Sequence, residues 1–166
     1  ALALSEVNKK FYEGIAKQFT ILYQHLVSLG KDKDDAKIFS SRLLGRLLFI
    51  WFLRKKGVVS KEEKYFPRDI EEPTKYYNSV LIPLFFKTFN TPVYDRKSGD
   101  TETPYLNGGL FEPHENDWQF EETSFPQNYF NDLYEHLDKY NFTTDESSPD
   151  YEQVAIDPEM LCRVFE

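Results

Sequence analysis

The sequence of 166 residues predicts a mainly α-helical fold, a bundle of about four to five helices with long irregular loops and a small β-hairpin near the C-terminus. Apolar residues recur every three or four positions in several stretches, which is the spacing of one helix face. The run over residues 43–53 is apolar almost all round, as expected of a helix in the middle of a bundle. Aromatic residues make up 17% and charged residues 29% of the chain, so the composition is that of a globular protein with a ring-rich core.

The first predicted helix runs from a cap at Ser5 to a stop at Gly30. A helix whose apolar residues form a single stripe lies on the surface of a domain, with its polar side in water. The stripe here consists of Val7, Phe11, Ile15, Phe19, Leu22, Leu26 and Leu29.

The second predicted helix begins at Asp34 or Asp35 and ends at Gly57. Gly45 inside it costs about 1 kcal/mol of helix propensity, so we expect another element to approach closely there. Arg46 lies in the apolar run. Because an unpaired buried charge is very costly, we expect Arg46 to pair with a carboxylate from the acidic C-terminal part of the chain.

The later elements are less regular. A third helix is predicted over residues 74–90, and Pro83 should kink or split it. Residues 91–124 form a long loop rich in Gly, Pro, Asn and Asp, of a kind that is often functional or held against a neighbour. A fourth helix follows over residues 127–140.

The C-terminal residues predict a small hairpin and the start of another helix. Residues 141–144 and 153–156 read as two strands, joined by an acidic loop. Asp157 and Pro158 then have the cap and first-turn positions of a helix. Because that helix has barely begun at Glu166, we expect the chain to be a segment of a longer protein.

The net charge of −8 is unevenly distributed along the chain. Residues 1–68 hold 14 Lys and Arg against 7 Asp and Glu, whereas residues 69–166 hold 6 against 21. The basic part could face nucleic acid, which the acidic part would repel. Alternatively, the two parts attract each other.

Two further features bear on location. Cys162 is the single cysteine, so no disulfide can form within the chain, which fits a reducing compartment. Spanning a bilayer takes roughly 20 apolar residues, more than any run here, and the N-terminus does not resemble a signal peptide. We therefore expect a cytoplasmic protein that does not bind membranes.

Metal and nuclease patterns are weak. Asp34 or Asp35 with Glu62, Glu63 and Lys64 loosely matches a metal-dependent nuclease, as does Asp69 with Asp95, Arg96 and Lys97. Neither set lies on a convincing pair of strands, and such matches arise easily in a charged chain. The histidines at 25, 114 and 136 do not have the spacing of metal ligands.

The strongest basic cluster is Arg54, Lys55 and Lys56 at the end of the second predicted helix. Cations are favoured at a helix C-terminus by the helix dipole, which is a purely structural explanation. The functional alternative is contact between these three residues and the backbone of DNA.

Three segments, in this order, carry a resemblance to a known family. They are residues 8–12 together with 42–57, residues 104–112 (Pro-Tyr-Leu-Asn-Gly-Gly-Leu-Phe-Glu), and residues 154–166, which include Asp-Pro-Glu-Met-Leu. Together they resemble the region just ahead of the methyltransferase domain in fused type IIG/IIS restriction–modification enzymes. Related phage-defence methyltransferases look similar here. Cys162 stands where the family is expected to have Gly, a departure that concerns helix packing rather than chemistry.

The resemblance implies a function for the whole enzyme rather than an active site in this chain. It implies one helical connector domain over residues 1–166. From its charges and predicted elements, this domain has a basic helical half (1–90) and an acidic half of loop, helix and hairpin (91–166). Such a connector joins an endonuclease to an adenine-specific methyltransferase that uses S-adenosylmethionine, and Mg²⁺ is implied for the nuclease. The family's Gly-rich cofactor loop and Asn-Pro-Pro-Tyr motif do not occur here, so no catalytic residue can be assigned. The alternatives are a Mg²⁺-dependent nuclease domain and a helical protein-interaction module unrelated to DNA.

Overall fold

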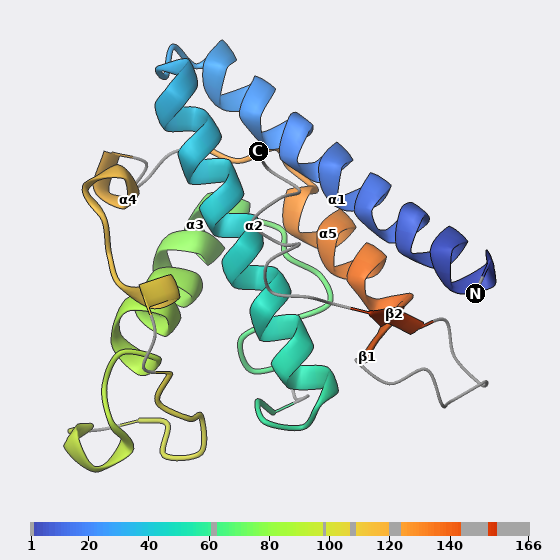
Figure 1. Ribbon diagram of the computed structural model, residues 1–166. Coiled ribbons are helices and arrows are strands. Elements are labelled where there is room, and N and C mark those ends of the chain that lie inside the picture. Colours follow the sequence, from blue (N-terminus) through green and yellow to red (C-terminus); the bar gives the residue numbers. More distant parts are fainter. Residues whose placement is uncertain are drawn as a thin grey trace.

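The computed structural model describes residues 2–60, 63–97, 99–106, 109–119, 124–143 and 153–155, and it confirms the mainly helical bundle (Figure 1). Two long helices, α1 (Leu2–Ser28) and α2 (Lys33–Lys55), run antiparallel and pack on each other. The shorter helix α5 (Tyr129–Asp138) packs against α1. None of the helices in these ranges is long and apolar enough to cross a membrane.

Helix α1 follows the predicted stripe but begins earlier than predicted. It starts at Leu2, so Ser5 lies inside the helix rather than at its cap. The residues before Ser5 are Ala and Leu, which are strong helix formers and extend the helix. Gly30 has a φ of 88° and ends it as predicted, since glycine reaches positive φ without strain. Phe11, Ile15 and Leu22 of the stripe are fully buried.

Helix α2 occupies the centre of the fold, as its apolar run predicts, and its cap is Asp32 rather than Asp34 or Asp35. The Asp32 carboxylate accepts hydrogen bonds from the backbone N–H groups of Asp34 at 3.0 Å and Asp35 at 3.1 Å. The expected close approach at Gly45 is wrong, because no described atom of another element lies within 4 Å of the place where a side chain would begin. The close approach occurs at Gly14 of α1, where a Cβ atom would overlap the His136 ring.

Pro83 interrupts the regular α-helical pattern of the third helical region but does not end the helix, which continues without a break over residues 73–88. Helix α3 (Pro73–Tyr76) continues into two wider π-helical turns, η1 (Tyr77–Leu81) and η2 (Leu84–Thr88), which lie on either side of the proline. Proline lacks a donor N–H and crowds the carbonyl of the preceding turn, so the regular hydrogen-bond pattern is interrupted there.

In its described residues, the predicted loop after this region contains short helical turns: η3 (Val93–Asp95), η4 (Gly109–Phe111) and α4 (Glu115–Gln119). Charged side chains organise its first part. Arg96 donates to four backbone carbonyls at 2.7–3.0 Å, those of Thr88, Thr91, Asp100 and Thr103. Asp100 accepts hydrogen bonds from the Tyr65 hydroxyl and from the side chain and backbone of Thr103.

The two short strands form where predicted but do not make a hairpin. Strand β1 (Asn141–Thr143) pairs with β2 (Gln153–Ala155) in parallel, with Phe142 opposite Val154. A hairpin requires antiparallel neighbours. Residue preferences identify strands but do not determine their relative direction, so the hairpin prediction is wrong in this respect. The predicted helix after Asp157 lies outside the described residues.

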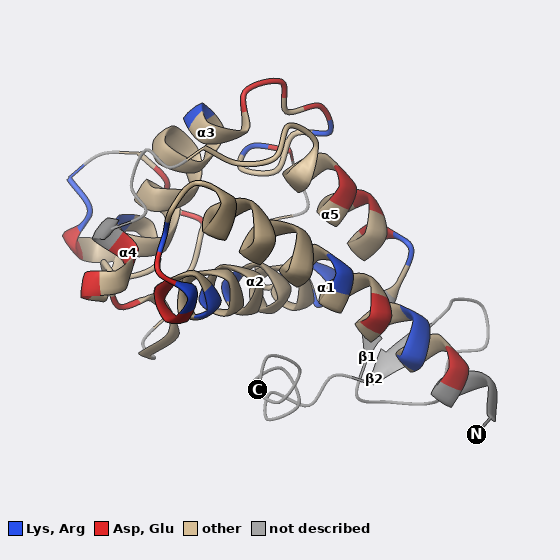
Figure 2. Ribbon diagram, turned by 90° about the horizontal axis from the view of Figure 1, so that it is seen from above, with Lys and Arg blue, Asp and Glu red and all other residues tan. Residues whose placement is uncertain are grey.

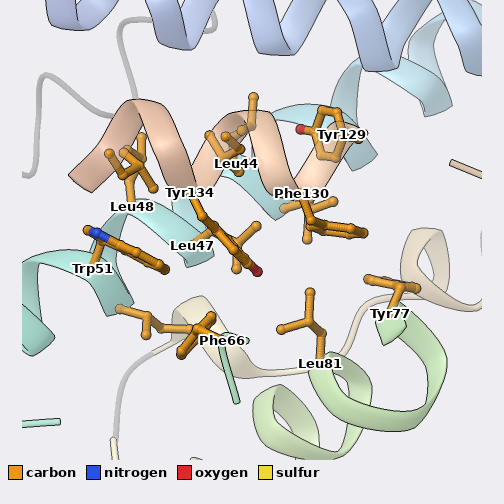
Figure 3. Packing of buried hydrophobic residues seen from close by; sticks show 14 of the residues in the cluster. Leu44, Leu47, Leu48, Trp51, Phe66, Tyr77, Leu81, Tyr129, Phe130 and Tyr134 are labelled. Atoms are coloured by element: carbon orange, nitrogen blue, oxygen red, sulfur yellow. The ribbon is translucent and has the colours of Figure 1, made fainter. Parts of the chain in front are cut away.

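The core lies between α2, α5 and the helical turns around Pro83, and rings fill much of it. Figure 3 shows Leu44, Leu47 and Trp51 of α2 facing side chains of α5. Trp51 stacks on Tyr134, with ring centroids 4.7 Å apart and an interplanar angle of 20°. All five predicted apolar positions of the fourth helix are buried: Phe130, Leu133, Tyr134, Leu137 and Tyr140.

Candidate functional site

The C-terminal end of α2 carries the predicted basic cluster, and its geometry follows from Gly57. Gly57 has a φ of 78°, and its N–H donates to the Arg54 carbonyl at 3.1 Å. The next N–H, that of Val58, donates to the Leu53 carbonyl at 2.9 Å. These two bonds form a Schellman motif, which ends the helix sharply and leaves the cluster in its last turn.

The three residues of the cluster differ in exposure. Arg54 is buried, with 9% of its surface exposed, whereas Lys55 is half-buried and Lys56 is exposed. The Arg54 guanidinium lies 4.5 Å from the ring centroid of Trp51 and 4.8 Å from that of Phe66. Burial lowers the pKa of Arg54, and nearby groups, Asp138 foremost, oppose that shift. Arg54 therefore belongs to the interior, while Lys56 and part of Lys55 face solvent.

A pocket of about 640 Å³ opens between this end of α2, the turn over residues 63–68 and helix α5. Trp51, Phe66 and Tyr134 contribute its aromatic residues, and burial raises the pKa of Tyr134, so that its hydroxyl stays protonated. Charged residues of both signs line the rest: Arg54, Lys55 and Arg68, and Glu63, Glu135 and Asp138. Acidic positions lie along α5, as Figure 2 shows.

A second charged cluster lies in the middle of α2 and confirms the predicted partner of Arg46. The Arg46 guanidinium binds both carboxylate oxygens of Asp117 in α4, at 2.9 and 3.1 Å, and each side chain is only 1% exposed. Burial by itself would raise the pKa of Asp117, but the hydrogen bonds and charge of Arg46 hold it below its ordinary value. This ion pair joins the basic and acidic parts of the chain, as does Lys64 with Asp100 at 3.4 Å.

The segment over residues 104–112, which carries the resemblance, is held against this cluster. Arg46 also donates to the backbone carbonyls of Leu110 at 2.9 Å and Glu112 at 3.2 Å. Phe111 is buried against Phe89, with ring centroids 4.7 Å apart. In the described part of this segment, therefore, the structure shows packing on α2 and its neighbours rather than a binding loop. Residues 107 and 108 lie outside the described residues.

The structure separates the first nuclease-like set. Asp34 and Asp35 lie in the first turn of α2, and Glu63 lines the pocket at its far end. A helix rises 1.5 Å per residue, so these carboxylates lie roughly 30 Å apart and cannot share a metal ion. Glu62 lies outside the described residues.

The second nuclease-like set is not held together by any interaction in the described part of the chain. Asp69, Asp95 and Lys97 are all exposed, and no described hydrogen bond or ion pair joins them. Arg96, which lies between two of them in sequence, orders the loop instead. Within the described ranges, no group of three or more His, Cys, Asp and Glu side chains could hold a metal ion.

The geometry thus defines a helical domain built around the central helix α2. The middle of α2 binds the acidic segment that contains Asp117, and its C-terminal end exposes Lys56 and part of Lys55 beside a pocket with charges of both signs. In sequence, the chain is similar to a protein of Methanocaldococcus jannaschii named "Putative type II restriction enzyme and methyltransferase", with 33% identity over 144 residues. The match covers 80% of this chain and 12% of that relative, so the chain spans about an eighth of the relative's length. No family model and no solved structure match the chain.

Proposed function

We propose that the chain is a helical connector in a cytoplasmic restriction–modification enzyme, where it positions an endonuclease and an S-adenosylmethionine-dependent adenine methyltransferase. The observation that carries the proposal is the match to one eighth of a relative whose name joins both activities. The three sequence segments that resemble the region ahead of the methyltransferase support it. In this proposal, S-adenosylmethionine and Mg²⁺ bind to the parts of the enzyme outside this chain.

The proposal includes a contact between the end of α2 and the DNA backbone. Lys56 is exposed and Lys55 half-exposed in the last turn of α2. Arg54 completes the predicted cluster, but its guanidinium packs on the rings of Trp51 and Phe66. In this proposal it therefore does not contact a phosphate. Contacts of this kind position DNA without reading its sequence.

DNA binding by two double variants tests this contact. The test variant is Lys55→Gln/Lys56→Gln, and the control variant is Lys33→Gln/Lys37→Gln. The control pair lies on the same helix, and both of its lysines are exposed near the N-terminal end. In a fluorescence anisotropy titration with duplexes of unrelated sequence, we expect weak, salt-sensitive binding. The first pair should reduce the salt slope by about 0.9 for every phosphate that the lysines no longer neutralise, and the control pair should leave the slope unchanged.

Two outcomes would contradict the connector proposal. Sequence-selective binding by this chain at physiological salt would assign it the recognition of a target site. Mg²⁺-dependent cleavage of DNA that Asp95→Ala abolishes would favour the nuclease alternative. The most direct test is the gene itself, in which we expect an Asn-Pro-Pro-Tyr motif downstream of Glu166.

A further inference from the structure

The pocket between the C-terminal end of α2 and the side of α5 is preformed. The side-chain amide of Asn131 in α5 accepts from the Ile70 N–H at 2.8 Å and donates to the Ile70 carbonyl at 3.0 Å, which ties the preceding turn to α5. Phe66 meets both Trp51 and Tyr134 edge-on, with centroids 5.2 and 5.5 Å apart. A partner therefore need not order these walls when it binds, and this lowers the cost of association.

The charges of the lining limit what the pocket can hold. The three cations and three carboxylates of the lining cancel in number, and Arg68 and Glu63 pair with each other at 2.6 Å. Glu135 and Asp138 form no ion pair within the described residues, although Asp138 accepts a hydrogen bond from the Trp51 indole at 3.1 Å and its charge partly offsets the burial of Arg54. The α5 wall therefore presents two carboxylates outside the ion pairs of the described residues, next to the apolar surface of Pro67 and Phe66.

These carboxylates disfavour nucleic acid, since each would repel a phosphate. Because Glu135 and Asp138 lie one helical turn apart on α5, they suit a single basic side chain placed between them. The volume lies in the range of sites that enclose a small ligand or a few side chains. A polypeptide that carries a basic residue beside an apolar one complements both the charges and the apolar edge.

We propose that this pocket is the docking site for a polypeptide segment of the same enzyme, outside this chain, which inserts Lys or Arg between Glu135 and Asp138 and lays an apolar side chain on Pro67 and Phe66. The inference rests on the proposed function, because the enzyme must extend beyond this chain. Docking here would fix the orientation of a neighbouring domain, while Lys56, which does not line the pocket, remains exposed.

Cysteine labelling of the intact enzyme tests the docking. The reporters on two sides of the pocket are Glu135→Cys and Arg68→Cys. The control for Glu135→Cys is Glu72→Cys, and the control for Arg68→Cys is Lys37→Cys. Each control replaces an exposed residue of the same charge. Maleimide labelling of each position is followed by peptide mass spectrometry, with and without added duplex DNA. We expect the docked segment to leave the pocket open less than about a tenth of the time. In the absence of DNA, both reporters should therefore react at least about tenfold more slowly than their controls.

Equal rates at reporters and controls would overturn the docking proposal, as would protection that arises only when DNA is added. Because Glu135→Cys itself removes one of the two carboxylates, a second variant is read out at the other reporter. Glu135→Lys should repel the basic side chain and restore fast labelling at Arg68→Cys. If labelling there stays slow, the proposed ion pair is wrong. A gene that encodes nothing beyond this chain would contradict the proposed function instead, so the two failures are distinguishable.

Discussion

At the scale of single residues, Arg46 shows how a charge is accommodated in an apolar helix. Its guanidinium donates four hydrogen bonds, two to the Asp117 carboxylate and two to backbone carbonyls, and it lies 4.8 Å from the ring centroid of Phe86. Arg42, one turn earlier, donates a hydrogen bond of 3.3 Å to the Glu112 carbonyl. Arg46 therefore anchors this acidic segment to α2 with four hydrogen bonds, and Arg42 adds one longer hydrogen bond to the same contact.

Arg46→Met should destabilise the protein by about 3–5 kcal/mol, because it leaves the Asp117 carboxylate buried without its partner. Arg42→Met is the matched control and should cost much less. The free energy of unfolding from urea titrations measures both, and Arg46→Met/Asp117→Asn should recover part of the stability. Equal destabilisation by the two single variants would contradict the role assigned to Arg46.

At the scale of elements, the crossing of α1 and α5 depends on one glycine. The His136 ring of α5 lies against Gly14 of α1, and its Nε2 donates to the Phe11 carbonyl at 3.0 Å. The ring also stacks on Phe11, with centroids 5.8 Å apart. Because these contacts hold the ring in place, the two helices can approach only where α1 has no side chain.

Replacing the two helical glycines should therefore have opposite effects. Gly14→Ala should cost about 1–3 kcal/mol, as overpacking usually does, because the new methyl overlaps the His136 ring. Gly45→Ala should stabilise α2 by up to about 1 kcal/mol, since its Cβ meets no neighbour. Thermal unfolding followed by circular dichroism compares them. Gly14→Ala/His136→Ala should remove the clash, and a stable Gly14→Ala variant would show that the ring can move aside.

At the scale of the whole molecule, acidic side chains hold the irregular segments on the helical core. Asp117 fastens α4 to α2, and Asp100 organises the loop that Tyr65 and Lys64 contact. Burial alone would raise the pKa of Asp100, but hydrogen bonds from Thr103 and Tyr65 hold it well below its ordinary value. Both carboxylates are therefore stabilised in their charged form by the folded structure.

Acid should weaken the fold in a defined pH range. A carboxylate whose pKa is lowered by folding adds stability above its unfolded pKa, here 3.8, and loses it as the pH falls through the folded value. We expect the urea midpoint to fall as the pH drops below 3.8. Asp100→Asn should flatten this dependence, whereas Asp95→Asn, at an exposed position in the same loop, should not. Identical acid profiles for the two variants would contradict the prediction.

The helical class, the central position of α2 and the need for a partner at Arg46 could be predicted from the sequence, because apolar periodicity and the cost of a buried charge are local properties. Helix ends were predicted to within a few residues: Gly30 and Gly57 end their helices as expected, whereas Asp32 and Leu2 replace the predicted starts. Of the predicted DNA-contact residues, the pattern could not distinguish Arg54 from its neighbours, since only packing against Trp51 and Phe66 makes it interior.

The remaining features depend on contacts between distant segments and could not be predicted from the sequence. The choice of Asp117 among many carboxylates, the close approach at Gly14 instead of Gly45, the parallel pairing of β1 with β2 and the pocket beside α5 all depend on which distant segments meet. The neighbouring residues in the sequence indicate what a position requires, such as a counter-ion or a small side chain. They do not indicate which distant residue meets that requirement, because its identity depends on how the helices pack around α2.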